Sequence, residues 1–149
     1  MKYFKYLFSF FVAILLFSSI NVFAEGNIVK LNVPKTVSKD QEFTVDIQVT
    51  SQDAIDGFKA TLTYETSSLE LLNMSVKDDW HQESQFKNES PLSLDFTHAN
   101  GLTGETTIAT LKFKVKSDAT KTDTSISIEG TTRVKEDETI NTFEKVSET

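Results

Sequence analysis

Apolar and polar residues alternate along most of this chain with a period of two. In residues 43–49 and 58–64 every second side chain is apolar and those between are mostly polar. Such alternation is typical of a β-strand that buries one face and exposes the other. Similar runs occupy 29–33, 69–76, 92–97 and 108–116, and Ile126 with Ile128 marks another. No segment sustains a helical period, so the pattern predicts an all-β protein.

Polar, turn-forming segments separate these runs. They include Ser38–Gln41, Glu65–Ser68 and the glycine-containing cluster Asn100–Gly104. We expect short hairpins from residues 85–88 with 92–97, and from 133–135 with 139–143, and a frayed end at 145–149. Eight to ten short strands at this spacing indicate an antiparallel β-sandwich.

The first 24 residues differ from the rest of the chain. Lys2 and Lys5 give a basic start, residues 7–17 are uncharged and largely apolar, and a small residue, Ala24, ends the segment. This order is typical of a secretory signal peptide. The apolar run is short for a membrane span, which needs about 20 residues, although an uncleaved N-terminal anchor is the alternative. We expect a signal peptide at 1–24, one domain at 25–149 and no membrane segment after cleavage.

Charge and cysteine content narrow the function classes. Loss of the leader would leave 13 basic and 22 acidic residues, changing the net charge from −7 to −9. An acidic surface disfavours nucleic acid and anionic membranes as partners. The absence of cysteine excludes disulfides, thiolate metal sites and cysteine nucleophiles. Export without disulfides is common in Gram-positive bacteria, so we expect an extracellular protein of such a host.

Two segments resemble the cohesin domains of bacteria. Residues 57–72, GFKATLTYETSSLELL, match the family's "GF-x-x-x-L-x-Y-D-P-x-x-L-E" run, with Glu65 and Thr66 in place of Asp and Pro. Residues 104–130 are similar to its later Gly-led strand, loop and strand. The resemblance covers nearly all of 28–130 and implies a jelly-roll sandwich of about nine strands. It also implies a non-catalytic module that binds dockerins, the small calcium-loaded modules of polysaccharide-degrading enzymes in cellulosomes.

The resemblance also indicates a binding surface. In cohesins one sheet carries the partner, and here the matching strands are 57–64, 85–88, 92–97 and 125–129. By alternation, the outward residues are Lys59, Thr61, Thr63, Lys87, Ser93, Asp95, Ser127 and Glu129. This mixture of charges and hydroxyls predicts a hydrogen-bonding interface with charge selection, and an ordinary solvated sheet face is the alternative. The face has no apolar anchor of the kind that centres tight interfaces, which shifts the expected anchor to a loop.

The loop with the only tryptophan is a second candidate site. Trp80, followed by His81, could contact a sugar or a protein, whereas the alternative is that Trp80 plugs one end of the core. The second hypothesis is therefore a carbohydrate-binding module that uses this loop, and the third is an adhesin-like structural domain. Flat polysaccharides require coplanar rings, and alternation leaves only Trp80, Phe86 and Phe143 outside the predicted core.

The sequence gives little support to catalysis. His81 and His98 are expected in loops, and neither a nucleophile elbow nor a zinc-binding His-Glu-x-x-His occurs. Asp78-Asp79 is better interpreted as a solvated turn than as an acid–base pair. Asp137 between two glutamates could hold calcium, although solvation is favoured. We expect no enzymatic activity, no cofactor and no metal; polysaccharide remains a possible ligand beside a protein partner.

Overall fold

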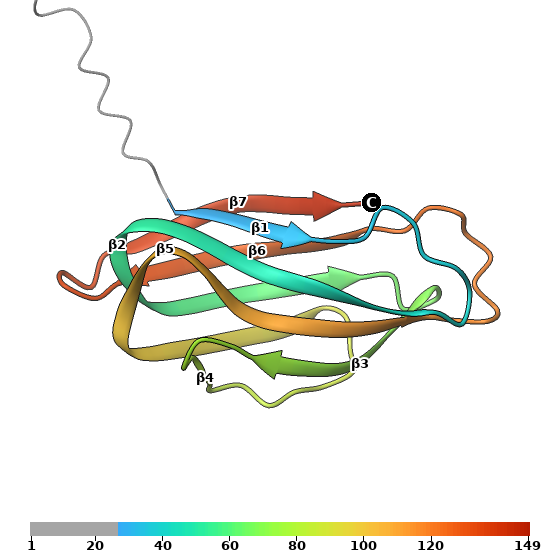
Figure 1. Cartoon of the computed structure of the whole chain (residues 1–149), viewed down its shortest axis with the longest axis horizontal. Coiled ribbons are helices and arrows are strands. Elements are labelled where there is room, and N and C mark those ends of the chain that lie inside the picture. The colour runs from blue at the N-terminus through green and yellow to red at the C-terminus, as the bar shows by residue number, and fades with distance from the viewer. Residues whose placement is uncertain (1–26) are drawn as a thin grey trace, which may run out of the picture.

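The computed structural model describes residues 27–149, and the predicted signal peptide lies outside them. Seven β-strands make up this part of the chain, and Figure 1 shows their arrangement. None of the described residues forms a helix long and apolar enough to cross a membrane. The strands are β1 (Ile28–Asn32), β2 (Glu42–Tyr64), β3 (Leu69–Val76), β4 (His81–Gln82), β5 (Leu92–Val115), β6 (Ile126–Val134) and β7 (Ile140–Glu148).

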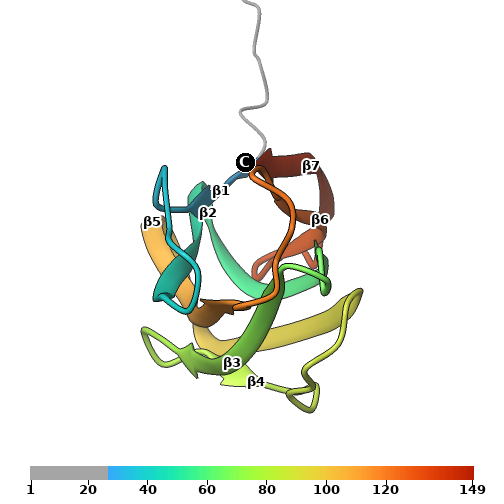
Figure 2. The same ribbon diagram turned by 90° about the vertical axis from the view of Figure 1, so that its right-hand side faces the viewer.

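The strands form one antiparallel sheet that folds over on itself into a sandwich. Its order is β3-β5-β2-β6-β7, with β1 added to β2 and β4 added to β5. The first half of β2 pairs with β1 and with the second half of β5, and its second half pairs with β6 and with the first half of β5. Figure 2 shows the strands surrounding a common interior when the molecule is viewed along its length.

Both long strands bend at the same end of the molecule (Figure 1). The β2–β5 register shifts between Ser51 and Ile55 and again before Gly57. Opposite this bend, Gly101 and Gly104 have φ angles of 69° and 78°, a left-handed conformation that glycine adopts without steric cost. Bulges and glycines of this kind let a strand pass from one layer to the other without ending.

The core lies between the two layers and consists of the apolar side chains predicted by alternation. Phe58, Phe96 and Phe113 are fully buried. Phe58 stacks on Phe143 with ring centroids 5.5 Å apart. Tyr64 from one layer meets the edge of Phe113 from the other at 5.1 Å. Aromatic pairs of this geometry stabilise a core beyond their buried area, and the Tyr64–Phe113 pair joins the two layers.

The structure confirms the predicted all-β sandwich and corrects several details. The predicted strands 43–49 and 58–64 are both part of β2, and 92–97 and 108–116 both fall largely within β5. Counting each half of these two strands separately, the seven strands correspond to about nine of the predicted kind. Residues 85–88 are not a strand; the short edge strand is β4. The C-terminal residues are not frayed, because Glu148 of β7 pairs with Ile126 of β6. The predicted hairpin around 135–139 is present as the β6–β7 connection.

Candidate functional site

One outer surface of the sandwich gathers most of the predicted site residues. It is the exposed side of β4, the first half of β5, the second half of β2, and β6, and we call it the polar face. Residues opposite one another in an antiparallel sheet point to the same side, and the register gives three rows. These rows are His81-Thr97-Gly57-Arg133, Asp95-Lys59-Thr131 and Ser93-Thr61-Glu129.

The predicted residues fall into three groups. Six lie on the polar face: Lys59, Thr61, Thr63, Ser93, Asp95 and Glu129. Lys87 is exposed but belongs to the loop between β4 and β5, where it pairs with Glu89 at 3.6 Å. Ser127 does not present its side chain, because it is only 6% exposed between Thr63 of β2 and Ser147 of β7. The predicted outward exposure of Ser127 is therefore wrong.

Ion pairs and hydrogen bonds hold the charged side chains of this face in place. Lys59 Nζ lies 3.2 Å from the Asp95 carboxylate, directly across the β2–β5 pair. Thr97 donates its hydroxyl to Glu83 at 2.7 Å. Since these contacts are solvent-exposed, each contributes little to folding. Their effect is to fix the positions of the donors and acceptors that the face offers.

Arg133 is a site residue that the sequence reasoning missed. Its guanidinium donates to Asp56 at 2.8 Å, and this contact raises the pKa of Arg133. The side chain lies over Gly57: a Cβ at that position would approach Arg133 Cβ to 3.1 Å and Nε to 3.4 Å. Gly57 therefore provides the room in which Arg133 crosses β2 to reach its carboxylate.

Two carboxylates at the polar face have no ion-pair partner among the described residues. Lys59 and Arg133 neutralise Asp95 and Asp56. Within residues 27–149, by contrast, Glu83 and Glu129 form no ion pair with any cation. They occupy opposite edges of the face, because Glu83 follows β4 and Glu129 belongs to β6.

Exposed apolar side chains flank this surface. The large hydrophobic residues most exposed among those described are Ile140 at 66%, Ile28 at 51% and Phe86 at 38%. Ile140 is opposite Arg133 in the β6–β7 register and so shares the polar face. Phe86 lies in the 83–91 loop, which Ser84 fastens to the backbone of Asp95. Ile28 lies on the other layer, since β1 pairs with the first half of β2.

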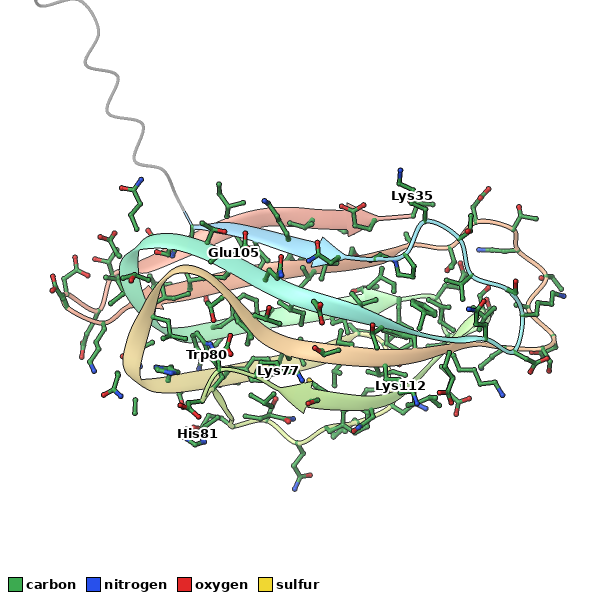
Figure 3. The ribbon with its side chains drawn as sticks, in the orientation of Figure 1. Lys35, Lys77, Trp80, His81, Glu105 and Lys112 are labelled. Carbon is green, nitrogen blue, oxygen red and sulfur yellow. The ribbon has the colours of Figure 1, made fainter. Side chains whose placement is uncertain are left out.

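The tryptophan is a core residue and is not exposed in a ligand loop. Trp80 is 4% exposed, and its ring centroid lies 5.4 Å from that of His98, which is buried in β5 and not in a loop as expected. His81, by contrast, is exposed on β4 (Figure 3). Phe143 is also buried, which leaves Phe86 as the exposed aromatic ring in the described part of the chain. The coplanar rings that a flat polysaccharide requires are therefore missing from residues 27–149.

The described residues contain no cluster of three or more His, Cys, Asp or Glu side chains that could hold a metal ion. Asp137, the candidate for calcium, instead accepts a hydrogen bond from the backbone N–H of Thr139 at 3.0 Å. This contact lowers the pKa of Asp137. The carboxylate thus supports the turn between β6 and β7.

Comparison with known proteins identifies the family. The model of the cohesin domain matches residues 28–148, whereas no curated protein matches the chain. Among solved structures, the seventh ScaB type I cohesin of Pseudobacteroides cellulosolvens is 19% identical, with a TM-score of 0.61 over 82% of this chain and 90% of that one. The cohesin module of a family 33 glycoside hydrolase from Clostridium perfringens is 13% identical, with a TM-score of 0.60 over 83% and 92%.

A third solved structure is the sixth cohesin of scaffoldin B from Acetivibrio cellulolyticus, in complex with a mutant Cel5 dockerin. It is 17% identical, with a TM-score of 0.58 over 73% of this chain and 86% of that one. Identities this low show a shared fold, while the family model covers almost all of the described residues. The chain belongs to the cohesin domain family.

Proposed function

We propose that this chain is a secreted, non-catalytic module that binds a dockerin-type module of a polysaccharide-degrading enzyme through its polar face. Membership of the cohesin family and the dockerin-bound cohesin of Acetivibrio cellulolyticus support this proposal. The observation that carries it is the polar face itself. It presents fixed donors and acceptors on a rigid sheet, and its outward side is not covered by any other element among residues 27–149.

The chemistry of the face defines the partner surface that fits it. The uncompensated carboxylates of Glu83 and Glu129 favour a partner that presents cations at two separated points. Phe86 and Ile140 are the apolar anchors, since exposed aromatic and aliphatic side chains supply much of the energy of such interfaces. The complementary surface is amphipathic and basic.

A direct binding measurement tests the proposal. The purified protein is immobilised, and calcium-loaded dockerin modules from the host's secreted enzymes are passed over it. We expect specific binding in calcium and release by EDTA, because dockerins fold around calcium. If none of the host's dockerins binds, the proposal fails.

Paired variants then locate the interface. Replacing Lys59 and Asp95 together by Ala should weaken binding, because the face loses a donor and an acceptor that orient the partner, and unchanged affinity would contradict this interface. The matched control replaces Lys112 and Glu42, an ion pair 2.5 Å apart on the other layer, and should leave affinity unchanged. Phe86→Ala and Ile140→Ala should each weaken binding about tenfold, whereas Ile28→Ala should not. Equal losses for Ile28 and Ile140 would place the interface elsewhere.

A further inference from the structure

The sequence contains one Asn-Gly pair, Asn100-Gly101, and it lies at the bend of β5 (Figure 1). The register with β2 shifts between Thr97 and Leu102, so both residues belong to an irregular stretch of the ladder. The backbone of such a stretch is held by fewer pairing contacts than the regular strand on either side. The bend is therefore a place where the chain can change its local conformation.

The side chain of Asn100 is exposed and is not held by a neighbour. Its backbone N–H donates to His98 Nδ1 at 3.3 Å, but its carboxamide has no hydrogen-bond partner among residues 27–149. By contrast, hydrogen bonds hold the carboxamides of Asn27 and Asn88. The Asn100 side chain can therefore rotate and turn its Cγ atom towards the peptide group that follows it.

Gly101 provides an unobstructed backbone nitrogen next to this side chain. It has a φ of 69°, and no Cβ lies beside its nitrogen. Each of the other asparagines in the sequence is followed by a residue with a side chain, as Asn73 is by Met74. A reaction between nitrogen and Cγ needs the two atoms within about 3–3.5 Å and in line, and a side chain on the following residue hinders that approach.

We propose that Asn100 deamidates spontaneously in the folded protein. The backbone nitrogen of Gly101 loses its proton to water and attacks Cγ of Asn100, so a C–N bond forms. The Cγ–Nδ2 bond then breaks and Nδ2 takes up a proton and leaves as ammonia, which closes a five-membered succinimide ring. Water opens this ring at either carbonyl and gives aspartate or isoaspartate at residue 100. No oxidant, reductant or cofactor takes part.

The products change the bend in different ways. Both add a negative charge at residue 100, and isoaspartate also adds one carbon atom to the backbone. The bend has little room for it, because a Cβ at Gly101 would already lie 3.2 Å from Ala54 Cβ and 3.3 Å from Lys135 Cδ. Lys135 also fixes the preceding peptide group, since its ammonium donates to the Ala99 carbonyl at 2.6 Å. Isoaspartate should therefore destabilise the bend more than aspartate does.

Peptide mapping by mass spectrometry tests the proposal on the purified protein, incubated in mildly alkaline buffer below its melting temperature. Conversion adds about 1 Da, since ammonia is lost and water is gained. We expect Asn100 to convert at least about tenfold faster than Asn73 in the same sample, although Asn73 is also exposed. The rate should rise with pH, because the attacking nitrogen must be deprotonated. Equal rates at the two asparagines would overturn the proposal.

A parallel incubation in guanidinium shows whether the folded molecule reacts. The rate at Asn100 in native buffer should stay within about 100-fold of the rate in the unfolded chain. A reaction that required unfolding would be slower by the folding equilibrium constant, about a thousandfold or more. A native rate more than about 100-fold below the unfolded rate would therefore overturn the proposal.

Two variants at this position separate the site from its consequence. Asn100→Gln should abolish the conversion, because a six-membered ring closes far more slowly, and an unchanged mass gain in the same peptide would place the reaction at another residue. Asn100→Asp is the matched control for the product, since it adds the charge without the extra backbone carbon. The isoaspartate form, separated by ion exchange, should melt below Asn100→Asp. An equal or higher melting temperature would overturn the expected effect on the bend.

Discussion

Gly130 of β6 occupies a position that tolerates no side chain. A Cβ there would lie 2.0 Å from the carbonyl oxygen of Lys59 and 2.7 Å from Cα of Ala60. Both atoms belong to the backbone of β2, which pairs on its other side with β5, so neither can rotate away. Unbonded carbon and oxygen atoms need about 3.3 Å, so β6 would have to move from β2 by about 1.3 Å.

The cost of Gly130→Ala follows from that displacement. It would break the ladder hydrogen bonds beside Gly130, worth about 1 kcal/mol each, and add the strain of overpacking, about 1–3 kcal/mol. We expect a loss of about 3–5 kcal/mol of folding free energy, a large part of the stability of a domain of this size.

Guanidinium unfolding followed by Trp80 fluorescence measures this loss. The control is Gly104→Ala, because Gly104 has a φ of 78° but no atom within 4 Å of its Cβ position. It should cost only the strain of the left-handed conformation, about 1–2 kcal/mol. Equal losses in the two variants, or a loss below about 1.5 kcal/mol for Gly130→Ala, would refute the steric reasoning.

Three further predictions concern buried and titrating groups. Trp80→Ala should lower the folding free energy by about 3–5 kcal/mol, and Trp80→Phe should lower it far less, because the indole N–H has no hydrogen-bond partner to lose. Unfolding followed by circular dichroism compares the two variants. Burial raises the pKa of the Tyr64 hydroxyl. The stabilisation that this shift gives is therefore complete below the unfolded pKa of about 10 and is lost as pH rises through the pKa of the folded protein. Tyrosinate absorbance during a pH titration, compared between the native protein and Tyr64→Phe, checks this. A hydrogen bond from Lys121 lowers the pKa of the Glu65 carboxyl. The contribution of this contact to folding stability is therefore present above the unfolded pKa of Glu65 and is lost as pH falls through its pKa in the folded protein. NMR titration should show that Lys121→Ala returns the pKa of Glu65 towards its ordinary range.

The alternation of side chains predicted the core well, because burial within a strand depends on local sequence. Val45, Ile47, Phe58 and Leu62 are all buried as expected. The number of strands was harder to predict: Asn100–Gly104 has the composition of a turn, yet pairs across the bend as part of β5. Whether such glycines end a strand or bend it depends on the neighbouring strand, which one sequence does not reveal.

The candidate site was predicted only in part for a related reason. Lys59, Thr61 and Asp95 follow directly from alternation, and the register places them on one face. Arg133 was missed because the predicted strand of the face ended at residue 129, whereas β6 continues to Val134. The exposure of Ser127 was predicted wrongly because it depends on β7, whose C-terminal residues 145–149 were expected to be frayed.

The composition of the polar face limits how it can bind. Charged and hydroxyl groups that leave water for a partner gain little net affinity, so they mainly provide specificity and orientation. Lys59 already forms an ion pair with Asp95. A partner must therefore either contact both side chains with the ion pair intact or replace one of them in it. Net affinity must then come from desolvating Phe86 and Ile140. High salt should therefore slow association by screening Glu83 and Glu129, while dissociation should respond mainly to the loss of the two apolar side chains.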